Sequence, residues 1–268
     1  MLKEVKNDIN LSVITVVYNR KEEFESTIKN IISLEYQSLE IIVIDGGSND
    51  GTVDIIKKYQ KHINYWISEP DKGIYDAMNK GIKVAKGKWL SFMNAGDEYC
   101  SKNIISDIFK TNSDYNNIDL LIGNTIIKYE DFQRTLYVGN TEQIWKGAQF
   151  IHQSVLIKRS FQKSHLYNIK NKISADFEFF FKSFKSRANF KILPQVISVF
   201  RAGGISDTKR LSAVFSNMMV VFLNDSLSIK IILFYVLILT KMLITLIIKS
   251  ILPNKLIKYI QYKLYENS

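Results

Sequence analysis

Three carboxylates stand where apolar, strand-like segments of this chain come to an end. Asp45, Asp71 and Asp97 each follow such a segment within the first hundred residues. In an α/β protein, ligands bind outside the carboxyl ends of the strands, so side chains at these positions meet around one cleft. Carboxylates there accept hydrogen bonds from a nucleoside or hold a hard cation beside a diphosphate. The three acids therefore favour an enzyme that binds a sugar nucleotide.

The segment 68–82 is the most informative part of the chain. Its sequence, SEPDKGIYDAMNKGI, places a Pro and Gly turn directly before a helix and gathers Asp, Lys, Tyr and Asn side chains around that turn. A turn that served folding alone would not need so many polar groups. The expected helix, 74–85, packs its apolar side on a sheet and leaves Asp76 and Asn79 among the polar groups near its start.

Strand-like and helix-like segments alternate in the first hundred residues, which predicts βαβ units and a mainly parallel sheet flanked by helices. The expected strands are 11–17, 39–44, 63–67 and 89–93, and the expected helices are 24–34, 53–59 and 74–85. Further strands are expected at 119–123, 125–129 and 154–158, and a further helix at 175–186. The fold class is therefore α/β.

The last quarter of the chain is basic and apolar. From Arg201 onward nine Lys and Arg residues outnumber three Asp and Glu, and 231–248 holds one charge, Lys241. A central Lys costs a spanning helix about 2.5–3.5 kcal/mol. Lys230, Lys241 and Lys255 fall on one helical stripe, so we expect a helix that lies in the membrane interface with its lysines at the head groups. A spanning helix and a buried helix are the alternatives. We divide the chain into an α/β domain, 1–206, and a C-terminal helical, membrane-associating segment, 207–268.

Composition and charge narrow the class further. The chain has 268 residues, of which 46% are hydrophobic, and can bury a sizeable core. Its one cysteine, Cys100, allows no intramolecular disulfide framework, and its charged N-terminus lacks the apolar core of a signal peptide. A net charge of +10 suits an acidic partner, but a nucleic-acid face would interleave basic and polar residues rather than carry a long aliphatic run. We therefore expect a cytoplasmic protein at an anionic membrane surface, with no nucleic-acid partner.

Four motifs resemble those of the family 2 glycosyltransferases of the GT-A fold. They are Ile14 to Arg20, Val43 to Thr52, Ser68 to Ile82 and Phe92 to Asp97, in the family's order and spacing. The likeness continues through 152–153, 175–178 and 203–206, and so covers roughly residues 10–206. The resemblance implies a Rossmann-like GT-A sheet and an inverting reaction, in which an acceptor hydroxyl displaces a nucleoside diphosphate from the far side of a sugar.

The resemblance also implies roles for individual residues. Donor binding falls to Tyr18, Asn19, Arg20, Asp45, Lys72, Asp76, Asn79 and Asn94. Asp176 resembles the general base, with Glu178 as the alternative. Asp97 and His152 are the expected metal ligands. The residues expected to bind the acceptor or to belong to a loop over the donor are Gln153, Glu178, Arg201, Gly203 and Gly204. Several of these residues also have a structural alternative: Asn19 and Asp45 would close turns, and His152 would pack in the core.

The chain departs from the family at the metal motif. Asn94 and Gly96 stand where the family has acids, and Gly46 replaces a second acid after Asp45. Of the motif's acids, Asp97 then remains as the strong ligand for a hard cation. We expect Mn²⁺ or Mg²⁺ as the cofactor.

The resemblance favours transfer of a hexose from UDP-galactose or UDP-glucose to an N-acetylhexosamine on undecaprenyl diphosphate, at the cytoplasmic face of the bacterial inner membrane. O-antigen and capsule assembly use such steps. A nucleotidyltransferase is one alternative, although it would need a Gly-rich basic loop after the first strand, and Tyr18 to Glu22 is not one. A non-catalytic scaffold that kept the fold is the other, motivated by Asn94 and Gly96.

Overall fold

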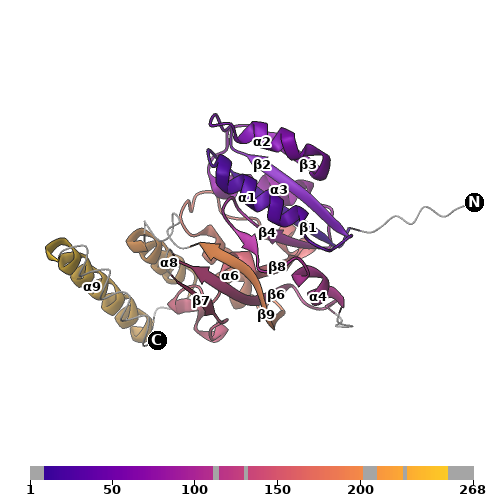
Figure 1. Cartoon of the computed structure of the whole chain (residues 1–268). Coiled ribbons are helices and arrows are strands. Elements are labelled where there is room, and N and C mark those ends of the chain that lie inside the picture. Colours follow the sequence, from indigo (N-terminus) through magenta and orange to yellow (C-terminus); the bar gives the residue numbers. More distant parts are fainter. Residues whose placement is uncertain (1–8, 111–114, 130–131, 202–209, 226–227, 253–268) are drawn as a thin grey trace, which may run out of the picture.

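One curved sheet runs through the molecule and carries helices on both of its faces (Figure 1). The computed structural model describes residues 9–110, 115–129, 132–201, 210–225 and 228–252. The expected loop residues Gly203 and Gly204 lie outside the described residues. The strands follow the order β3-β2-β1-β4-β8-β6-β9-β5, with β7 paired to β6.

The strands are β1 (Leu11–Val17), β2 (Leu39–Asp45), β3 (Tyr65–Ser68), β4 (Trp89–Phe92), β5 (Glu98–Tyr99), β6 (Leu120–Lys128), β7 (Gln133–Leu136), β8 (Val155–Lys158) and β9 (Phe190–Arg201). The α-helices are α1 (Lys21–Ile32), α2 (Thr52–Tyr59), α3 (Ile74–Val84), α4 (Ile104–Lys110), α5 (Arg159–Ser164), α6 (Ala175–Lys185), α8 (Arg210–Asn224) and α9 (Ile229–Ile251). Three 3₁₀ turns are η1 (Gln60–His62), η2 (Thr141–Lys146) and η3 (His152–Ser154).

The central strands are apolar without interruption because both faces of the sheet are covered. Every residue of β1 is buried, and alternate side chains enter two different cores. Val13 packs in the core that contains Phe24 of α1, and Ile14 packs in the core that contains Met78 of α3. The second contact is close because Gly81 has no side chain: a Cβ there would lie 2.5 Å from Ile14 Cγ2.

The sheet is parallel through β3, β2, β1 and β4 and mixed beyond them. β8 runs antiparallel to both β4 and β6, whereas β6 and β9 are parallel to each other. β6 is one strand where the sequence pattern predicts two, because a register irregularity at Asn124 breaks the apolar pattern without ending the strand. Asn124 Nδ2 donates to Pro194 O across that irregularity (2.8 Å). The predicted α/β class with flanking helices is confirmed.

The C-terminal helices lie at one side of the domain (Figure 1). α8 packs on α6, and α9 contacts α8 and the η2 turn. Tyr235 Oη donates to Trp145 O (2.7 Å), and Lys230 Nζ lies 5.6 Å from the centre of the Trp145 ring. Lys230 therefore faces the domain, and Lys255 of the predicted stripe lies outside the described residues. Within the part of the chain that the structure describes, no helix has both the length and the apolarity required to cross a membrane.

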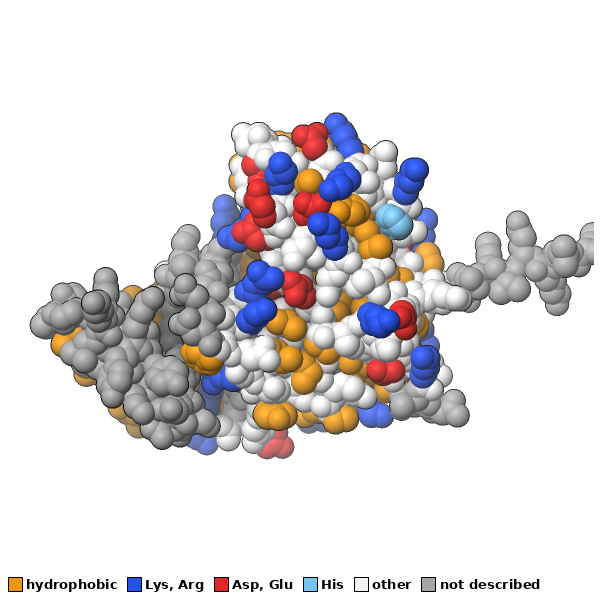
Figure 2. All heavy atoms as spheres, viewed as in Figure 1, with side chains coloured by type: hydrophobic (Ala, Val, Ile, Leu, Met, Phe, Trp, Pro, Cys, Tyr) orange, Lys and Arg blue, Asp and Glu red, His pale blue; other side chains and the backbone are white. Residues whose placement is uncertain are grey.

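Surface charges on the N-terminal part of the molecule are mixed in sign. On the face drawn in Figure 2, acidic and basic side chains stand side by side over the upper part, where α1 and α2 lie. Glu25 of α1 binds Lys58 of α2 (2.8 Å) and Lys29 of its own helix (3.2 Å). These opposite charges are therefore balanced locally rather than arranged as a basic stripe.

Candidate active site

Asp45 shapes the turn at the carboxyl end of β2. Its carboxylate is completely buried and accepts hydrogen bonds from Gly47 N (3.1 Å), Ser48 N (2.9 Å), Ser48 Oγ (2.5 Å) and Ser68 Oγ (2.5 Å). These donors come from its own turn and from the end of β3. The predicted donor-binding acid therefore holds its own turn against the end of β3, and both of its oxygens are engaged within the fold.

The end of β1 is fixed against the same turn. Asn19 has a left-handed backbone (φ 49°), and its N–H donates to Ser48 Oγ (2.8 Å) while its Oδ1 accepts from Asn49 N (2.9 Å). Asn tolerates this conformation better than most residues. Tyr18 is 62% exposed at the edge of the turn, and Arg20 pairs with Glu23 (3.1 Å). The arrangement leaves the Tyr18 ring open to stack on a planar ligand.

Asp71 joins this group, although the family resemblance gave it no role of its own. A Cβ on Gly46 would lie 3.2 Å from Asp71 Oδ2 and 3.3 Å from Tyr18 Cδ2, so a side chain at position 46 would occupy the space between them. Burial raises the pKa of Asp71 above its ordinary value, while an ion pair with Lys80 opposes that rise. The available signal was that Asp71 is the third acid placed after a strand.

The helix that follows holds the other predicted donor-binding residues. Asp76 Oδ2 accepts from Lys72 N (3.0 Å), which closes the turn before α3 and leaves the Lys72 side chain exposed. Asn79 is buried, and its side-chain amide exchanges two hydrogen bonds with the Tyr167 backbone, at 2.9 and 3.0 Å. Asn79 therefore ties α3 to the segment before α6.

Asp97 lies at the end of β4 and is 6% exposed. Its Oδ2 accepts from Gln153 Nε2 (2.8 Å) and from Asn94 N (3.1 Å). Burial raises the pKa of Asp97 to about 7, against the smaller opposing effect of these two donors. Gln153, predicted on the acceptor side, thus contacts the predicted metal ligand. Arg201 donates to Glu98 Oε1 beside it (2.8 Å).

Oxygen atoms suited to a hard cation occur at this corner. Asn94 Oδ1 is buried and has no hydrogen-bond partner among the described residues, and the Asp97 carboxylate belongs to the same turn. Carboxylate and amide oxygens are the ligands that Mg²⁺ and Mn²⁺ prefer. Among the described residues, no group of three or more His, Cys, Asp and Glu side chains could hold a metal ion. Asn94 and Asp97 therefore fit a cation only if that cation takes its other ligands from a bound diphosphate.

His152 packs in the core behind Gln153. Its Nε2 lies 2.9 Å from Tyr167 Oη, and its ring is 4.9 Å from the ring of Phe92. Burial lowers the pKa of His152, while the nearby Asp176 carboxylate opposes this effect. The imidazole is thus neutral at pH 7, and its Nε2 is engaged by a tyrosine hydroxyl, which matches the structural alternative for this residue.

Asp176 lies at the start of α6, where a side chain of α3 contacts it. Tyr75 Oη, from α3, donates to Asp176 Oδ1 (2.8 Å) and lies 3.2 Å from Ile173 O. Tyr75 itself is 7% exposed, whereas Asp176 is partly exposed. The predicted base is therefore held by the helix that begins at the donor-side turn, and it remains open to solvent.

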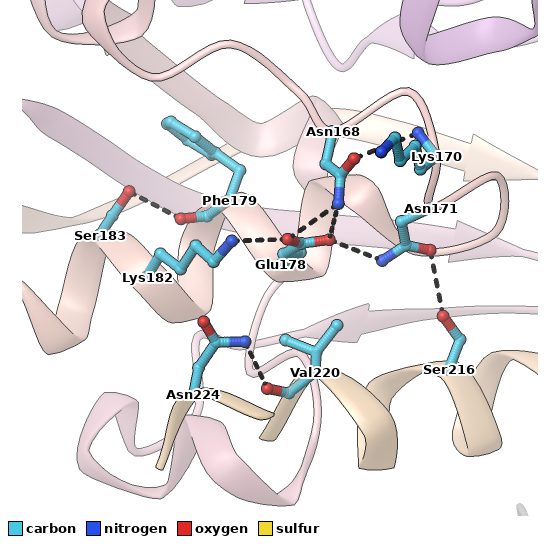
Figure 3. Close-up of polar contacts among 10 residues, drawn as sticks. All are labelled: Asn168, Lys170, Asn171, Glu178, Phe179, Lys182, Ser183, Ser216, Val220 and Asn224. Carbon is cyan, nitrogen blue, oxygen red and sulfur yellow. Dashed lines mark hydrogen bonds and ion pairs between the residues drawn. The ribbon is translucent and has the colours of Figure 1, made fainter. Parts of the chain in front are cut away.

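Glu178 lies in a polar cluster formed by α6 and the loop before it (Figure 3). Its carboxylate accepts from Asn168 (3.1 Å), Asn171 (3.0 Å) and Lys182 (2.6 Å). Burial raises the pKa of Glu178, but the hydrogen bonds from Lys182, Asn171 and Asn168 bring it below its ordinary value. Glu178 therefore fastens the loop before α6 and is the less suitable of the two predicted bases.

Known proteins share sequence with much of this chain. The family model described as glycosyl transferase family 2 matches residues 12–190. The chain belongs to glycosyl transferase family 2. One relative in this family, a PGL/p-HBAD biosynthesis glycosyltransferase of Mycobacterium bovis, is 27% identical over 175 residues, which cover 63% of this chain and 68% of the relative. An uncharacterised glycosyltransferase of Mycobacterium tuberculosis is 38% identical over 97 residues, which cover 36% of this chain and only 37% of that protein.

Solved structures share the fold of this family 2 chain. TarS of S. aureus in complex with UDP-GlcNAc superposes with a TM-score of 0.65 and 16% identity, over 82% of this chain and 68% of that one. The mannosyltransferase PcManGT of Pyrobaculum calidifontis, in complex with GDP-Man and Mn²⁺, gives a TM-score of 0.63 and 15% identity, over 82% and 66%. At these identities the likeness shows the fold alone, and it confirms the predicted GT-A class.

Proposed function

We propose that this family 2 protein is an inverting glycosyltransferase that moves a hexose from a UDP-sugar to a sugar carried on a lipid diphosphate. The observation that carries the proposal is the hydrogen bond between Tyr75 and Asp176. It joins the helix of the donor-side turn to the carboxylate that resembles the family's base. A base and a donor site must meet in this way for an acceptor hydroxyl to attack the sugar.

Asp176 acts as the general base in this reaction. Oδ1 is occupied by the Tyr75 hydroxyl, whereas Oδ2 accepts no hydrogen bond from a described residue. Oδ2 is then the atom that takes the proton of the acceptor hydroxyl as the new glycosidic bond forms and the bond to UDP breaks. Tyr75 orients the carboxylate through Oδ1.

The donor lies along the carboxyl ends of β1, β2 and β4. Tyr18 stacks on the nucleobase of the donor. Asp71 accepts a hydrogen bond from the nucleobase or the ribose, in the space that Gly46 leaves free. Asn94 Oδ1 and the Asp97 carboxylate would hold Mn²⁺ or Mg²⁺, which supplies positive charge for the departing diphosphate. The complexes of TarS with UDP-GlcNAc and of PcManGT with GDP-Man and Mn²⁺ support a nucleotide-sugar donor and a divalent cation.

The acceptor and the site of action follow from the basic, apolar C-terminal segment. On α9, large apolar side chains are exposed: Ile229, Leu233, Val236, Leu237, Leu243 and Ile244. An exposed aliphatic face on a chain with net charge +10 suits an anionic lipid surface. We therefore place the enzyme at the cytoplasmic face of the bacterial inner membrane, with an undecaprenyl-diphosphate sugar as acceptor in surface-polysaccharide synthesis.

The test is transfer of label from a panel of radiolabelled nucleotide sugars to a synthetic lipid-diphosphate sugar, with release of the nucleoside diphosphate measured in parallel. The proposal predicts label in the lipid from a UDP-hexose, and loss of most of that signal in excess EDTA. Transfer from GDP-sugars alone would overturn the proposed donor. No release of nucleoside diphosphate from any donor would instead favour the non-catalytic scaffold.

A further inference from the structure

An open apolar cavity of about 800 Å³ lies between the loop before α6 and the two C-terminal helices. Its apolar lining comprises Ile173, Leu211, Phe215, Met219, Leu239 and Leu243. Phe215 and Leu243 are each 53% exposed, so side chains of the described residues do not fill the cavity. Its volume falls in the range of about 300–1,000 Å³ that is typical of small-molecule sites.

Two lysines stand at the polar side of this cavity. Lys170 and Lys172 belong to its lining, both are exposed, and neither forms an ion pair with a residue that the structure describes. The loop that carries them is held in place, because Asn171 donates to Glu178 (3.0 Å) and accepts from Ser216 (3.1 Å) (Figure 3). The lining of this apolar cavity thus includes two positive charges on a loop that is held in place.

The Tyr75 hydroxyl contacts both the cavity lining and the candidate base. Ile173, which lines the cavity, accepts through its carbonyl from the same Tyr75 hydroxyl that binds Asp176 Oδ1. Lys172 and Asp176 are only four residues apart along the chain. The cavity lining and the candidate base are therefore linked through the Tyr75 hydroxyl.

We propose that this cavity binds the first isoprenoid units of the acceptor lipid and that Lys170 and Lys172 bind its diphosphate. This inference rests on the proposed function. An acceptor of this kind has an aliphatic chain, then two phosphates, then the sugar whose hydroxyl reacts. The apolar lining complements the aliphatic chain, Lys170 and Lys172 complement the phosphates, and Asp176 complements the reacting hydroxyl. An apolar protein segment would match the cavity wall but would leave the two lysines without a partner.

Binding of farnesyl diphosphate to the purified full chain tests the proposal by titration calorimetry, without donor or turnover. The double variant Lys170→Glu/Lys172→Glu and the variant Phe215→Asp should each bind at least tenfold more weakly than the wild type. Two matched controls, Lys61→Glu on η1 and Leu223→Asp on α8, should bind as the wild type does. Leu223 is 76% exposed and lies outside the cavity lining, so its replacement leaves the cavity intact.

Two further ligands separate the contributions. Farnesol lacks the phosphates and inorganic diphosphate lacks the chain, so both should bind much more weakly than farnesyl diphosphate. Equal affinity of all variants for farnesyl diphosphate would overturn the proposal, as would binding of inorganic diphosphate with the same affinity. If the cavity instead serves bulk phospholipid, the cavity variants would lose binding to phosphatidylglycerol vesicles while they keep farnesyl diphosphate. Because binding is read without transfer, a failed glycosyltransferase assay would leave this result interpretable.

Discussion

Ionisation of buried Asp97 should make the protein less stable as the pH rises. Burial raises the pKa of this carboxyl from its ordinary 3.8 to about 7, so the folded protein binds a proton that the unfolded chain has already released between these pH values. Stability therefore falls with increasing pH across this window and levels off above it. At about 1.4 kcal/mol per pKa unit, the ionised carboxylate costs the folded state about 4 kcal/mol in total, of which about 2–3 kcal/mol appears between pH 5 and 8.

The variant Asp97→Asn isolates this effect, since its amide oxygen can still accept from Gln153 and from Asn94 N. Urea denaturation of both proteins at pH 5 and at pH 8 gives the free energies of unfolding. The variant should gain about 2–3 kcal/mol on the wild type between the two pH values. Other carboxylates titrate equally in both proteins, so they do not contribute to the difference in free energy of unfolding between the variant and the wild type. If the difference in free energy of unfolding between the two proteins is the same at pH 5 and pH 8, Asp97 does not titrate as proposed. A wild type that is more stable than the variant at pH 8, measured without a divalent cation, would also contradict a costly buried carboxylate.

Three further predictions follow from the contacts around the site. Tyr75→Phe removes the donor to Asp176, so kcat should fall about tenfold with KM for the UDP-sugar unchanged; a raised KM with an unchanged kcat would count against a positioning role. Glu178→Gln should lower the free energy of unfolding by about 1–3 kcal/mol and leave the pH–rate profile in place, measured by urea denaturation and steady-state kinetics. Gly87→Ala puts a Cβ 2.5 Å from Ser12 N, so it should destabilise by at least about 1–3 kcal/mol, and an unchanged urea midpoint would contradict that contact.

The N-terminal half of the sheet is predictable from the sequence because its signals are local. Buried strands such as β1 are continuous β-branched runs, and the acids after them mark the edge where a ligand binds. β9 lacks that signal. Its exposed and buried side chains do not alternate regularly, it contains Pro194, and it pairs with β6 from about 70 residues away. Long-range pairing of this kind leaves little trace in a local pattern.

The site shows the same division between local and distant information. Asp176 could be predicted from its motif, but its partner Tyr75 lies 101 residues away on another helix. Likewise the motif identifies Gln153, whereas only the fold reveals that it donates to Asp97. Asp71 is visible as an acid after a strand, yet its proposed role depends on the space left by Gly46, which is a property of packing. Residue types are thus readable from the sequence, and their pairing requires the fold.

The most direct test of the account is the turnover of Asp176→Asn, measured as release of UDP from a UDP-hexose in the presence of the lipid-diphosphate acceptor. The asparagine keeps the shape of the side chain and cannot take a proton at neutral pH. The account predicts a loss of about 10²–10⁴-fold in turnover, with the Kd for UDP unchanged because the base acts on the acceptor. Turnover within a few-fold of the wild type would contradict the assignment of Asp176 as the base, and abolition by Glu178→Gln in the same assay would place the base two residues away.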